Sequence, residues 1–361
     1  MTDIAAIVDK PLLEVRNLAT YFHMESGVAR AVDGVSFSLF SNQTLAIVGE
    51  SGCGKSVTSM SIMRLLATPP AEYASGSIHF KGQDLLKASE KQMQKIRGGE
   101  IAMIFQEPMT SLNPVFTIGD QIMEAILLHQ NVNFAQAQEI AEQALQRVGI
   151  SEPRRRLQEY PHQMSGGMKQ RIMIAMALAC EPAILIADEP TTALDVTIQA
   201  QILELMREIE HQTGMGILLI THDLGVVAEN ADVVAVMYAG KIVEYADVNE
   251  LFSNPLHPYT KGLLACIPKL GQEHERLFTI PGMVPSPTQY GQGCRFAARC
   301  TECTGSVREK ELRASPELRE VKPQHWVASW NAPGYEKAKA TIPTLNFRRA
   351  APATFPVMEK A

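Results

Sequence analysis

The chain has 361 residues, which is enough for one large or two ordinary domains, and its 46% hydrophobic and 20% charged residues are typical of a globular protein. Its 39 acidic residues outnumber its 33 basic ones, and the net charge of −6 argues against a nucleic-acid-binding protein. Six cysteines are too few for a disulfide scaffold. The longest apolar run, residues 172–180, is nine residues long, against the ~20 that span a bilayer. The start of the chain shows no signal-peptide pattern, so we expect a cytoplasmic location.

The first third of the chain predicts strands and then a nucleotide-binding unit. Residues 12–22 alternate apolar and polar side chains, and residues 32–40 do the same after a turn. Residues 44–49 form a short apolar run that ends in glycine, and a helical pattern begins after residue 55. Strand, glycine-rich loop and helix in this order open nucleotide-binding α/β domains.

The middle of the chain predicts helices followed by parallel strands. Residues 75–85 form another strand and turn, and residues 115–180 carry apolar positions at helical spacing. Residues 183–188 and 216–223 are apolar runs with polar carboxyl ends, as in parallel strands whose ends carry functional residues. From about residue 270, prolines become frequent and periodicity weakens, which predicts a loop-rich C-terminal segment.

A phosphate-binding loop is predicted between the strand at 44–49 and the following helix. The segment matches G-x-x-x-x-G-K-[ST], and its strand–helix context supports the match. Its glycines allow backbone N–H groups to face phosphate oxygens, Lys55 is expected to reach the β- and γ-phosphates, and Ser56 to ligate Mg²⁺. We interpret Cys53 as a tolerated small residue. The loop consists of Gly49, Glu50, Ser51, Gly52, Cys53, Gly54, Lys55 and Ser56.

Two further segments complete the expected ATP chemistry. Asp188 ends an apolar strand and is expected to hold Mg²⁺, and Glu189 beside it to polarise the attacking water. Ser165, Gly166 and Gly167 open a helix, which suits them for binding phosphate. A second phosphate site is redundant within one chain, so we expect it to serve the nucleotide of another subunit.

These motifs together resemble the ATP-binding subunits of ABC transporters. Ser165-Gly166-Gly167 resembles the signature motif, residues 104–108 around Gln106 the Q-loop, residues 193–195 the D-loop, and residues 221–223 around His222 the switch-histidine loop. The resemblance covers residues 12–265. It implies two ATP molecules held between two nucleotide-binding domains, with Ser165 and Gly167 contacting the γ-phosphate of the opposing subunit's ATP.

The resemblance also implies individual roles and a fold. Gln106 is expected to ligate Mg²⁺ or the water, and His222 to contact the γ-phosphate, so Glu189, His222 and Gln106 are the expected catalytic residues. Phe22 resembles the aromatic residue that stacks on adenine; Tyr21 and a core role remain alternatives. The implied fold is an α/β P-loop NTPase of the ABC type with an antiparallel β subdomain, a helical subdomain and a small C-terminal domain.

Three segments narrow the resemblance to the D-type ATPase subunits of bacterial dipeptide/oligopeptide importers. They are residues 103–114, residues 187–197, and residues 257–261 together with 280–285. The implied function is ATP hydrolysis that powers peptide import from the cytoplasmic face of the inner membrane. The alternatives are a nickel or cationic-peptide importer and, less favoured, a soluble ABC ATPase. The implied partners are a second, related ATP-binding subunit, two permease subunits and, indirectly, a substrate-binding protein, without nucleic acid.

We therefore expect an ATP-binding domain over 12–270, a C-terminal domain over 271–335 and a flexible tail over 336–361. The helical subdomain is expected at about 107–180, and residues 107–160 with the Q-loop are expected to form the groove for a permease helix.

A cysteine cluster lies in the predicted C-terminal domain. In the resembled family this region commonly has four cysteines that can hold a [4Fe-4S] cluster, and Cys294 and Cys300 match the first two. Val307 stands at the usual third position, for which Cys303 is the substitute, and Ser329 stands at the fourth. Three alternatives stay open: a cluster completed by His325, Ser329 or solvent, another metal such as Zn²⁺, or thiols without a metal.

Overall fold

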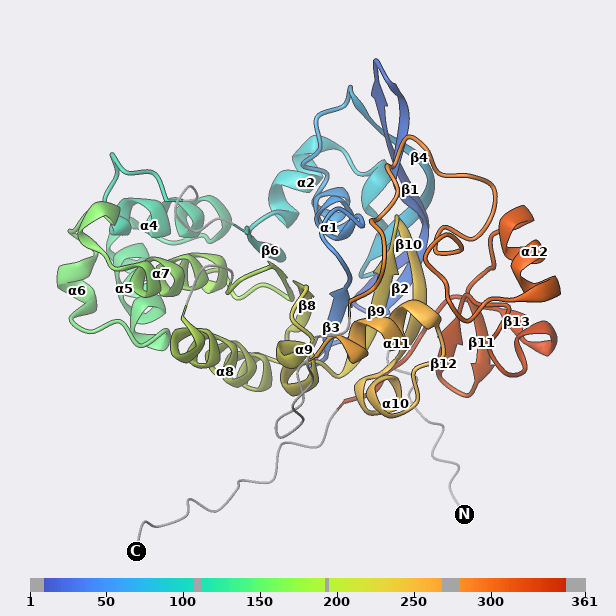
Figure 1. Ribbon diagram of the computed structural model, residues 1–361. Helices are drawn as coiled ribbons and strands as arrows, with labels where there is room; N and C mark the ends of the chain where they lie inside the picture. Colours follow the sequence, from blue (N-terminus) through green and yellow to red (C-terminus); the bar gives the residue numbers. More distant parts are fainter. Residues whose placement is uncertain (1–9, 107–111, 192–194, 268–278, 349–361) are drawn as a thin grey trace, which may run out of the picture.

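The computed structural model describes residues 10–106, 112–191, 195–267 and 279–348, and it contains two β-sheets (Figure 1). The smaller sheet is antiparallel, with the order β2-β1-β4-β5. Its strands are β1 (Leu13–Met24), β2 (Gly27–Leu39), β4 (Ala71–Phe80) and β5 (Gln83–Asp84). This sheet confirms the expected antiparallel β subdomain.

The larger sheet has nine strands in the order β13-β11-β12-β10-β9-β3-β8-β7-β6. Its parallel part is β3 (Thr44–Val48), β6 (Ile101–Ile104), β7 (Ile184–Asp188), β8 (Gly216–Thr221) and β9 (Val233–Tyr238). Its antiparallel part is β10 (Lys241–Asp247), β11 (Arg319–Lys322), β12 (His325–Val327) and β13 (Lys339–Ala340). Every residue of β3, β7, β8 and β9 is buried, because both faces of the parallel sheet are covered.

Helices form three groups around these sheets. Those near the sheets are α1 (Lys55–Met63), α2 (Glu90–Ile96), α8 (Val196–Thr213), α9 (Leu224–Asn230), α10 (Val248–Ser253) and α11 (Pro258–Ala265). A separate lobe, on the left of Figure 1, contains α4 (Ile118–His129), α5 (Phe134–Arg147), α6 (Pro153–Arg156) and α7 (Gly166–Leu178). The C-terminal region contributes α12 (Gly305–Arg313). Short 3₁₀ helices are η1 (Leu85–Lys87), η2 (Pro161–Gln163) and η3 (Tyr335–Lys337).

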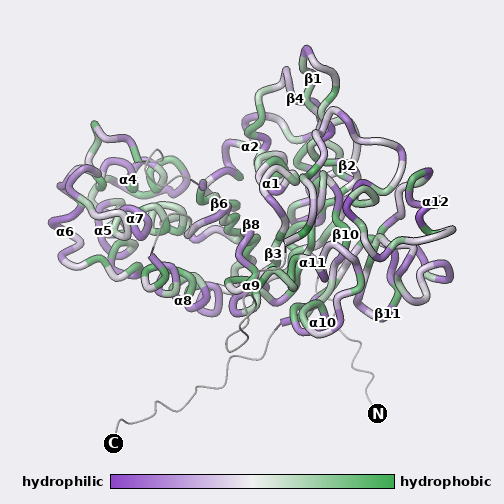
Figure 2. Tube along the Cα trace, in the orientation of Figure 1, coloured by the Kyte–Doolittle hydropathy of each residue, from purple (hydrophilic) through white to green (hydrophobic). Residues whose placement is uncertain are grey.

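The helical lobe forms where the spacing of apolar residues predicted it. Capping boxes at Thr117 and Asn133 start α4 and α5 by satisfying the first free backbone N–H groups. Ile118, Ile122 and Ile126 recur at a spacing of four and face the lobe's core. By contrast, α6 and α12 are strongly hydrophilic (Figure 2). No helix in the described ranges combines the length and apolar character needed to cross a membrane.

The C-terminal region is more ordered than its weak periodicity predicted. Residues 279–304 contain no helix or strand, as the expected loop-rich character implies, and β11–β13 then extend the larger sheet. Leu345 is fully buried, and Nε2 of Gln43 donates to the carbonyl oxygens of Leu345 and Phe347 at 2.9 Å. Within the expected flexible tail from residue 336, the described residues 336–348 contain the end of η3 and the strand β13, and Gln43 binds the backbone of Leu345 and Phe347; residues 349–361 lie outside the described part.

Candidate active site

The predicted phosphate loop lies between β3 and α1, as its sequence indicated. Gly49 and Gly54 have φ of +155° and +108°, and a Cβ atom at these positions would lie 2.1 Å from the carbonyl oxygen of Met237 and 2.3 Å from that of Ala31. Only glycine fits such close backbone approaches. Cys53 is buried inside the loop, in keeping with a small residue that packs there.

Lys55, Ser56 and Asp188 meet beneath the loop. Nζ of Lys55, which is 5% exposed, donates to the carbonyl oxygens of Gly49 at 2.8 Å and Glu50 at 3.2 Å. The hydroxyl of Ser56 donates to Oδ1 of Asp188 at 3.1 Å, and the hydroxyl of Ser59 donates to the other oxygen at 3.4 Å. Burial raises the pKa of Asp188, and the neighbouring carboxylate of Glu189 also raises it. A hydroxyl and a carboxylate at this spacing are oxygen donors of the kind that Mg²⁺ prefers.

Two of the expected catalytic side chains, Gln106 and His222, contact the third, Glu189. Nε2 of Gln106, at the end of β6, donates to Oε2 of Glu189 at 3.0 Å, and Nδ1 of His222, after β8, lies 3.2 Å from Oε1. Glu189 has a φ of +49°, and its backbone N–H donates to the carbonyl oxygen of Ile220 at 2.8 Å. The carboxylate thus lies between two segments that are 116 residues apart in sequence (222 − 106).

The signature segment lies elsewhere. Ser165 caps α7 by accepting from the N–H of Met168 at 3.3 Å, and Ser165 and Gly166 are exposed. Gly167 lies against Ile198 of α8. Figure 1 places α7 in the helical lobe and α1 beside the sheets, so these residues do not join the phosphate loop of their own chain.

The remaining predicted residues lie around this centre. Phe22 is half-buried on β1, whereas the hydroxyl of the neighbouring Tyr21 donates to Oδ1 of Asp33 at 2.7 Å. Tyr21 is therefore committed to a polar contact that an adenine-stacking ring does not need. Asp195 caps α8 through Thr197 and Ile198. The rest of the predicted D-loop, residues 193–194, and the residues that follow Gln106, 107–111, lie outside the described part.

Sequence reasoning missed the groups that hold the start of the phosphate loop. The hydroxyl of Tyr259, on α11, accepts from the N–H of Glu50 at 2.9 Å. Nη1 of Arg299, from the C-terminal region, lies 3.0 and 3.1 Å from the two carboxylate oxygens of Glu50. The arginine lies between two of the cysteines singled out in the sequence, but nothing in its spacing indicated a partner 249 positions earlier.

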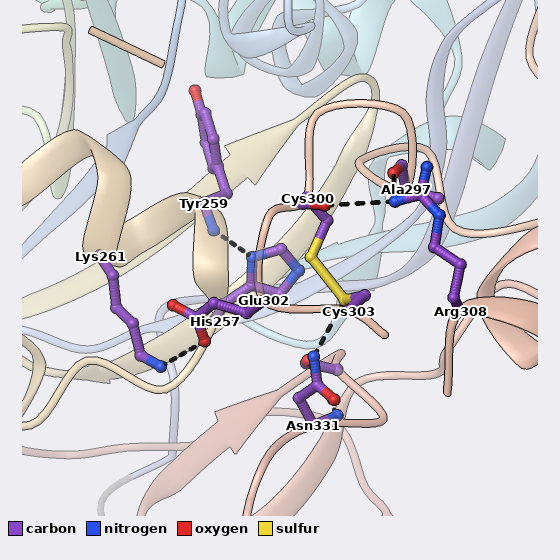
Figure 3. Close-up of a disulfide and its surroundings, with 10 residues drawn as sticks. His257, Tyr259, Lys261, Ala297, Cys300, Glu302, Cys303, Arg308 and Asn331 are labelled. Atoms are coloured by element: carbon purple, nitrogen blue, oxygen red, sulfur yellow. Dashed lines mark hydrogen bonds and ion pairs between the residues drawn. A yellow bond between two sulfur atoms is a disulfide. The ribbon is translucent and has the colours of Figure 1, made fainter. Parts of the chain in front are cut away.

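The cysteine cluster does not match the ligand set that the resemblance implied. Cys300 and Cys303 form a disulfide, and Asn331 donates to Sγ of Cys303 at 2.9 Å (Figure 3). Cys294 is a free thiol whose pKa is raised by burial to about 11. Glu311 places a buried carboxylate oxygen without a hydrogen-bond partner near the two joined sulfurs.

The expected substitute ligands are also engaged. The hydroxyl of Ser329 accepts from the N–H of Asn331 at 3.3 Å, and the ring nitrogens of His325 lie 2.8 Å from Glu244 and 3.2 Å from Glu250. The described residues therefore do not supply the four thiolates of a [4Fe-4S] cluster.

Comparison with protein families and curated relatives agrees with this geometry. The family described as ABC transporter matches residues 32–192, and the family described as oligopeptide/dipeptide transporter, C-terminal region, matches residues 243–306. A probable peptide ABC transporter ATP-binding protein of Sinorhizobium fredii is 54% identical over 322 residues, covering 89% of this chain and 95% of that protein. The dipeptide transport ATP-binding protein DppD of Bacillus subtilis is 56% identical over 289 residues, covering 80% of this chain and 86% of that protein.

Solved structures share the fold. The cassette cbiO1 from Clostridium perfringens superimposes with a TM-score of 0.59 at 27% identity, over 68% of this chain and 92% of that one. The bacterial ABC transporter cassette MJ0796 gives the same TM-score at 24% identity, over 65% and 98%.

Proposed function

The chain belongs to the ATP-binding subunits of peptide ABC transporters, and on this premise we propose that it binds and hydrolyses ATP to power peptide import through a separate permease. The observation that carries the proposal is the meeting of Gln106 and His222 at Glu189, beside the phosphate loop and Asp188. The relatives named above are peptide transport proteins. The nickel importer and the soluble ATPase that the sequence left open are therefore not favoured.

The roles of the individual residues follow from their positions. The glycines of the phosphate loop and Lys55 bind the triphosphate, and Phe22 stacks on the adenine. Ser56, Asp188 and the amide oxygen of Gln106 would hold Mg²⁺, which neutralises phosphate charge when it is bound. Glu189 accepts a proton from the attacking water, and His222 orients that carboxylate and contacts the γ-phosphate.

A second ATP-binding subunit completes the site. Ser165 and Gly166 are exposed at the start of a 13-residue helix, where backbone N–H groups and the helix dipole favour a phosphate. They do not reach the phosphate loop of the same chain. We infer that they bind the γ-phosphate of ATP held by a related partner chain, and that the partner's signature segment does the same for this chain.

The permease is expected to dock in a groove of about 480 Å³ between the end of β6, α4 and α7. Its lining is largely apolar and includes Met103, Phe105, Leu128 and Met176. Phe105 is 41% exposed and Leu128 73%, and both line this groove, so that apolar surface is gathered in one place there. An apolar groove of this kind suits the amphipathic helix of a partner, and such docking places the chain on the cytoplasmic face of the membrane.

The test is reconstitution of the chain with its permease, partner ATPase and binding protein in vesicles. We expect ATP-dependent peptide uptake, and loss of uptake when Lys55→Met replaces the wild-type subunit, because the triphosphate loses its main cation. Peptide-independent nickel uptake by the same complex would assign a different cargo. Absence of any ATP hydrolysis by the complex would contradict the proposed function as a whole.

A further inference from the structure

We propose that Arg299 of the C-terminal region is a positioning residue for the nucleotide, because it neutralises Glu50 and fixes the start of the phosphate loop. The inference rests on the proposed function, in which this loop binds ATP. It gives the C-terminal region, which contributes no predicted ATP-binding residue, a direct effect on nucleotide affinity.

The contact between Arg299 and Glu50 is close and largely shielded from water. Nη1 of Arg299 reaches both oxygens of the Glu50 carboxylate, and the two side chains are 6% and 30% exposed. The rest of the guanidinium is also held: Nε donates to the carbonyl oxygen of Pro281 at 2.8 Å and Nη2 to that of Ile280 at 3.3 Å. With these donors engaged, the arginine has one orientation, and this orientation sets the position of Glu50.

An aromatic cluster supports the same loop residue. Tyr238 packs against Tyr259 and Phe296, with ring centroids 4.6 and 5.2 Å apart, and Arg299 lies 5.7 Å from the Tyr238 ring centroid. The hydroxyl of Tyr259 accepts from the backbone N–H of Glu50. The side chain and the backbone of Glu50 are therefore both bound by residues outside the loop.

A second arginine of the same segment is held by an ion pair to strand β2. Arg295, whose side chain is 6% exposed, is paired with Asp33 and donates to the carbonyl oxygen of Ala239. Asp33 in turn accepts from Tyr21, next to the residue predicted to stack on adenine. Buried ion pairs of this kind add little net stability, but they fix orientation. Two such pairs therefore tie residues 295–299 to strand β2 and to the phosphate loop.

The charge of Glu50 explains why its neutralisation matters. A phosphate loop binds anions, and a free carboxylate within it repels a triphosphate. Arg299 cancels that charge and also holds the loop backbone. Without the arginine, the repulsion grows with the number of phosphate charges, so ATP is expected to lose more affinity than ADP. A residue that only stabilised the C-terminal region would not produce this dependence.

The experiment is calorimetric titration of the full-length chain with a non-hydrolysable ATP analogue and with ADP, both with Mg²⁺. We expect Arg299→Gln to raise the Kd for the ATP analogue about tenfold, as for loss of a charged hydrogen bond, and that for ADP by less. Arg299→Lys keeps the charge, and we expect its Kd for the ATP analogue to lie between those of Arg299→Gln and the wild type. The double variant Arg299→Gln/Glu50→Gln removes both charges and is expected to recover most of the affinity. Arg313→Gln, an exposed arginine on α12, is the matched control and is expected to bind as wild type does.

Thermal unfolding of each variant separates positioning from folding. Wild-type affinity in Arg299→Gln and Arg299→Lys would overturn the proposal. So would equal losses for ATP and ADP without recovery in the double variant, since that pattern describes a structural role alone. Failure of the wild-type chain to bind either nucleotide would instead contradict the proposed function.

Discussion

Nδ1 of His222 lies 3.2 Å from Oε1 of Glu189, although the two residues follow different strands of the larger sheet. The contact exists because β7 and β8 are parallel neighbours, so that their carboxyl ends meet at one edge. Gln106 reaches the other carboxylate oxygen from the end of β6, the next strand. Three consecutive strands of the sheet thus deliver the proposed water-activating carboxylate and its two neighbours.

Glu189→Gln should remove the proton acceptor while keeping the shape of this centre. We expect the rate of ATP hydrolysis by the assembled transporter to fall by about 10²–10⁴-fold, the usual contribution of a general base, with nucleotide binding retained. The ATP-bound dimer should then accumulate, which size-exclusion chromatography with ATP detects. Glu204→Gln, an exposed glutamate on α8, is the control. Wild-type turnover by Glu189→Gln would exclude the proposed role.

Ser165→Asp tests the composite site. Aspartate is as good a helix cap as serine, so α7 should stay folded, but its carboxylate would face the γ-phosphate of the partner's ATP. We expect an unchanged Kd for ATP in the isolated chain and a loss of about tenfold or more in the ATPase rate of the assembled transporter. A weakened Kd in the isolated chain would instead place Ser165 in its own chain's site.

Leu128→Glu tests the permease groove. The side chain is 73% exposed and lines the groove, so a charge there should leave the fold intact but penalise an apolar partner helix. We expect co-purification with the permease to fall about tenfold while ATP binding stays at the wild-type level. Leu312→Glu, at a 60% exposed position on α12, is the matched control. If both variants retained the permease equally, the permease would dock on a different surface of the chain.

The cysteine assignment can be checked by counting thiols. The chain has six cysteines and two of them form the Cys300–Cys303 disulfide, so the unfolded protein should show four reactive thiols before reduction and six after it. The bridge closes a very short loop, so its removal in Cys300→Ser should cost only about 2 kcal/mol of unfolding free energy. Bound iron or cluster absorbance in the purified chain would contradict this assignment.

Glu210 should make stability depend on pH. Its carboxyl is buried, accepts from the hydroxyl of Thr44 at 3.1 Å and lies near Asp232, and burial raises its pKa from 4.5 to about 8. Between pH 4.5 and about 8 the folded chain holds a proton that the unfolded chain has released. The free energy of unfolding therefore falls as pH rises through this range.

The matching variant is Glu210→Gln, which cannot titrate. Its stability relative to wild type should rise across the same window, by on the order of 1.4 kcal/mol per unit of pKa shift. Denaturant unfolding of both proteins below and above the window measures the difference. Parallel pH curves for the two proteins would show that Glu210 does not titrate in this range.

Local patterns were readable because local backbone geometry produces them. The phosphate loop needs glycine at Gly49 and Gly54, where backbone atoms approach closely, and a lysine at the start of the helix. The strand that ends at Asp188 is a continuous apolar run because both faces of its sheet are covered. The helical lobe likewise followed from apolar spacing in α4 and α5.

The sheet pairing of the C-terminal region, by contrast, left no such pattern in the sequence. Its strands β11–β13 have four residues or fewer, too short for periodicity to show, and they form because the edge strand β10 is available for pairing. Leu345 is likewise buried by residues far away in the sequence, and Nε2 of Gln43, 302 positions earlier, donates to its carbonyl oxygen.

By itself, the sequence determined the ATP-binding motifs and the order of the elements, since both depend on short stretches with characteristic geometry. The class of transporter subunit followed from the resemblance of such stretches to a known family. Only the tertiary structure decided that Gln106 and His222 meet at Glu189, that Ser165 lies apart from its own chain's phosphate loop, and that Arg299 binds Glu50. These contacts join residues far apart in the chain. They depend on strand order and on the packing of the C-terminal region, which no local pattern encodes.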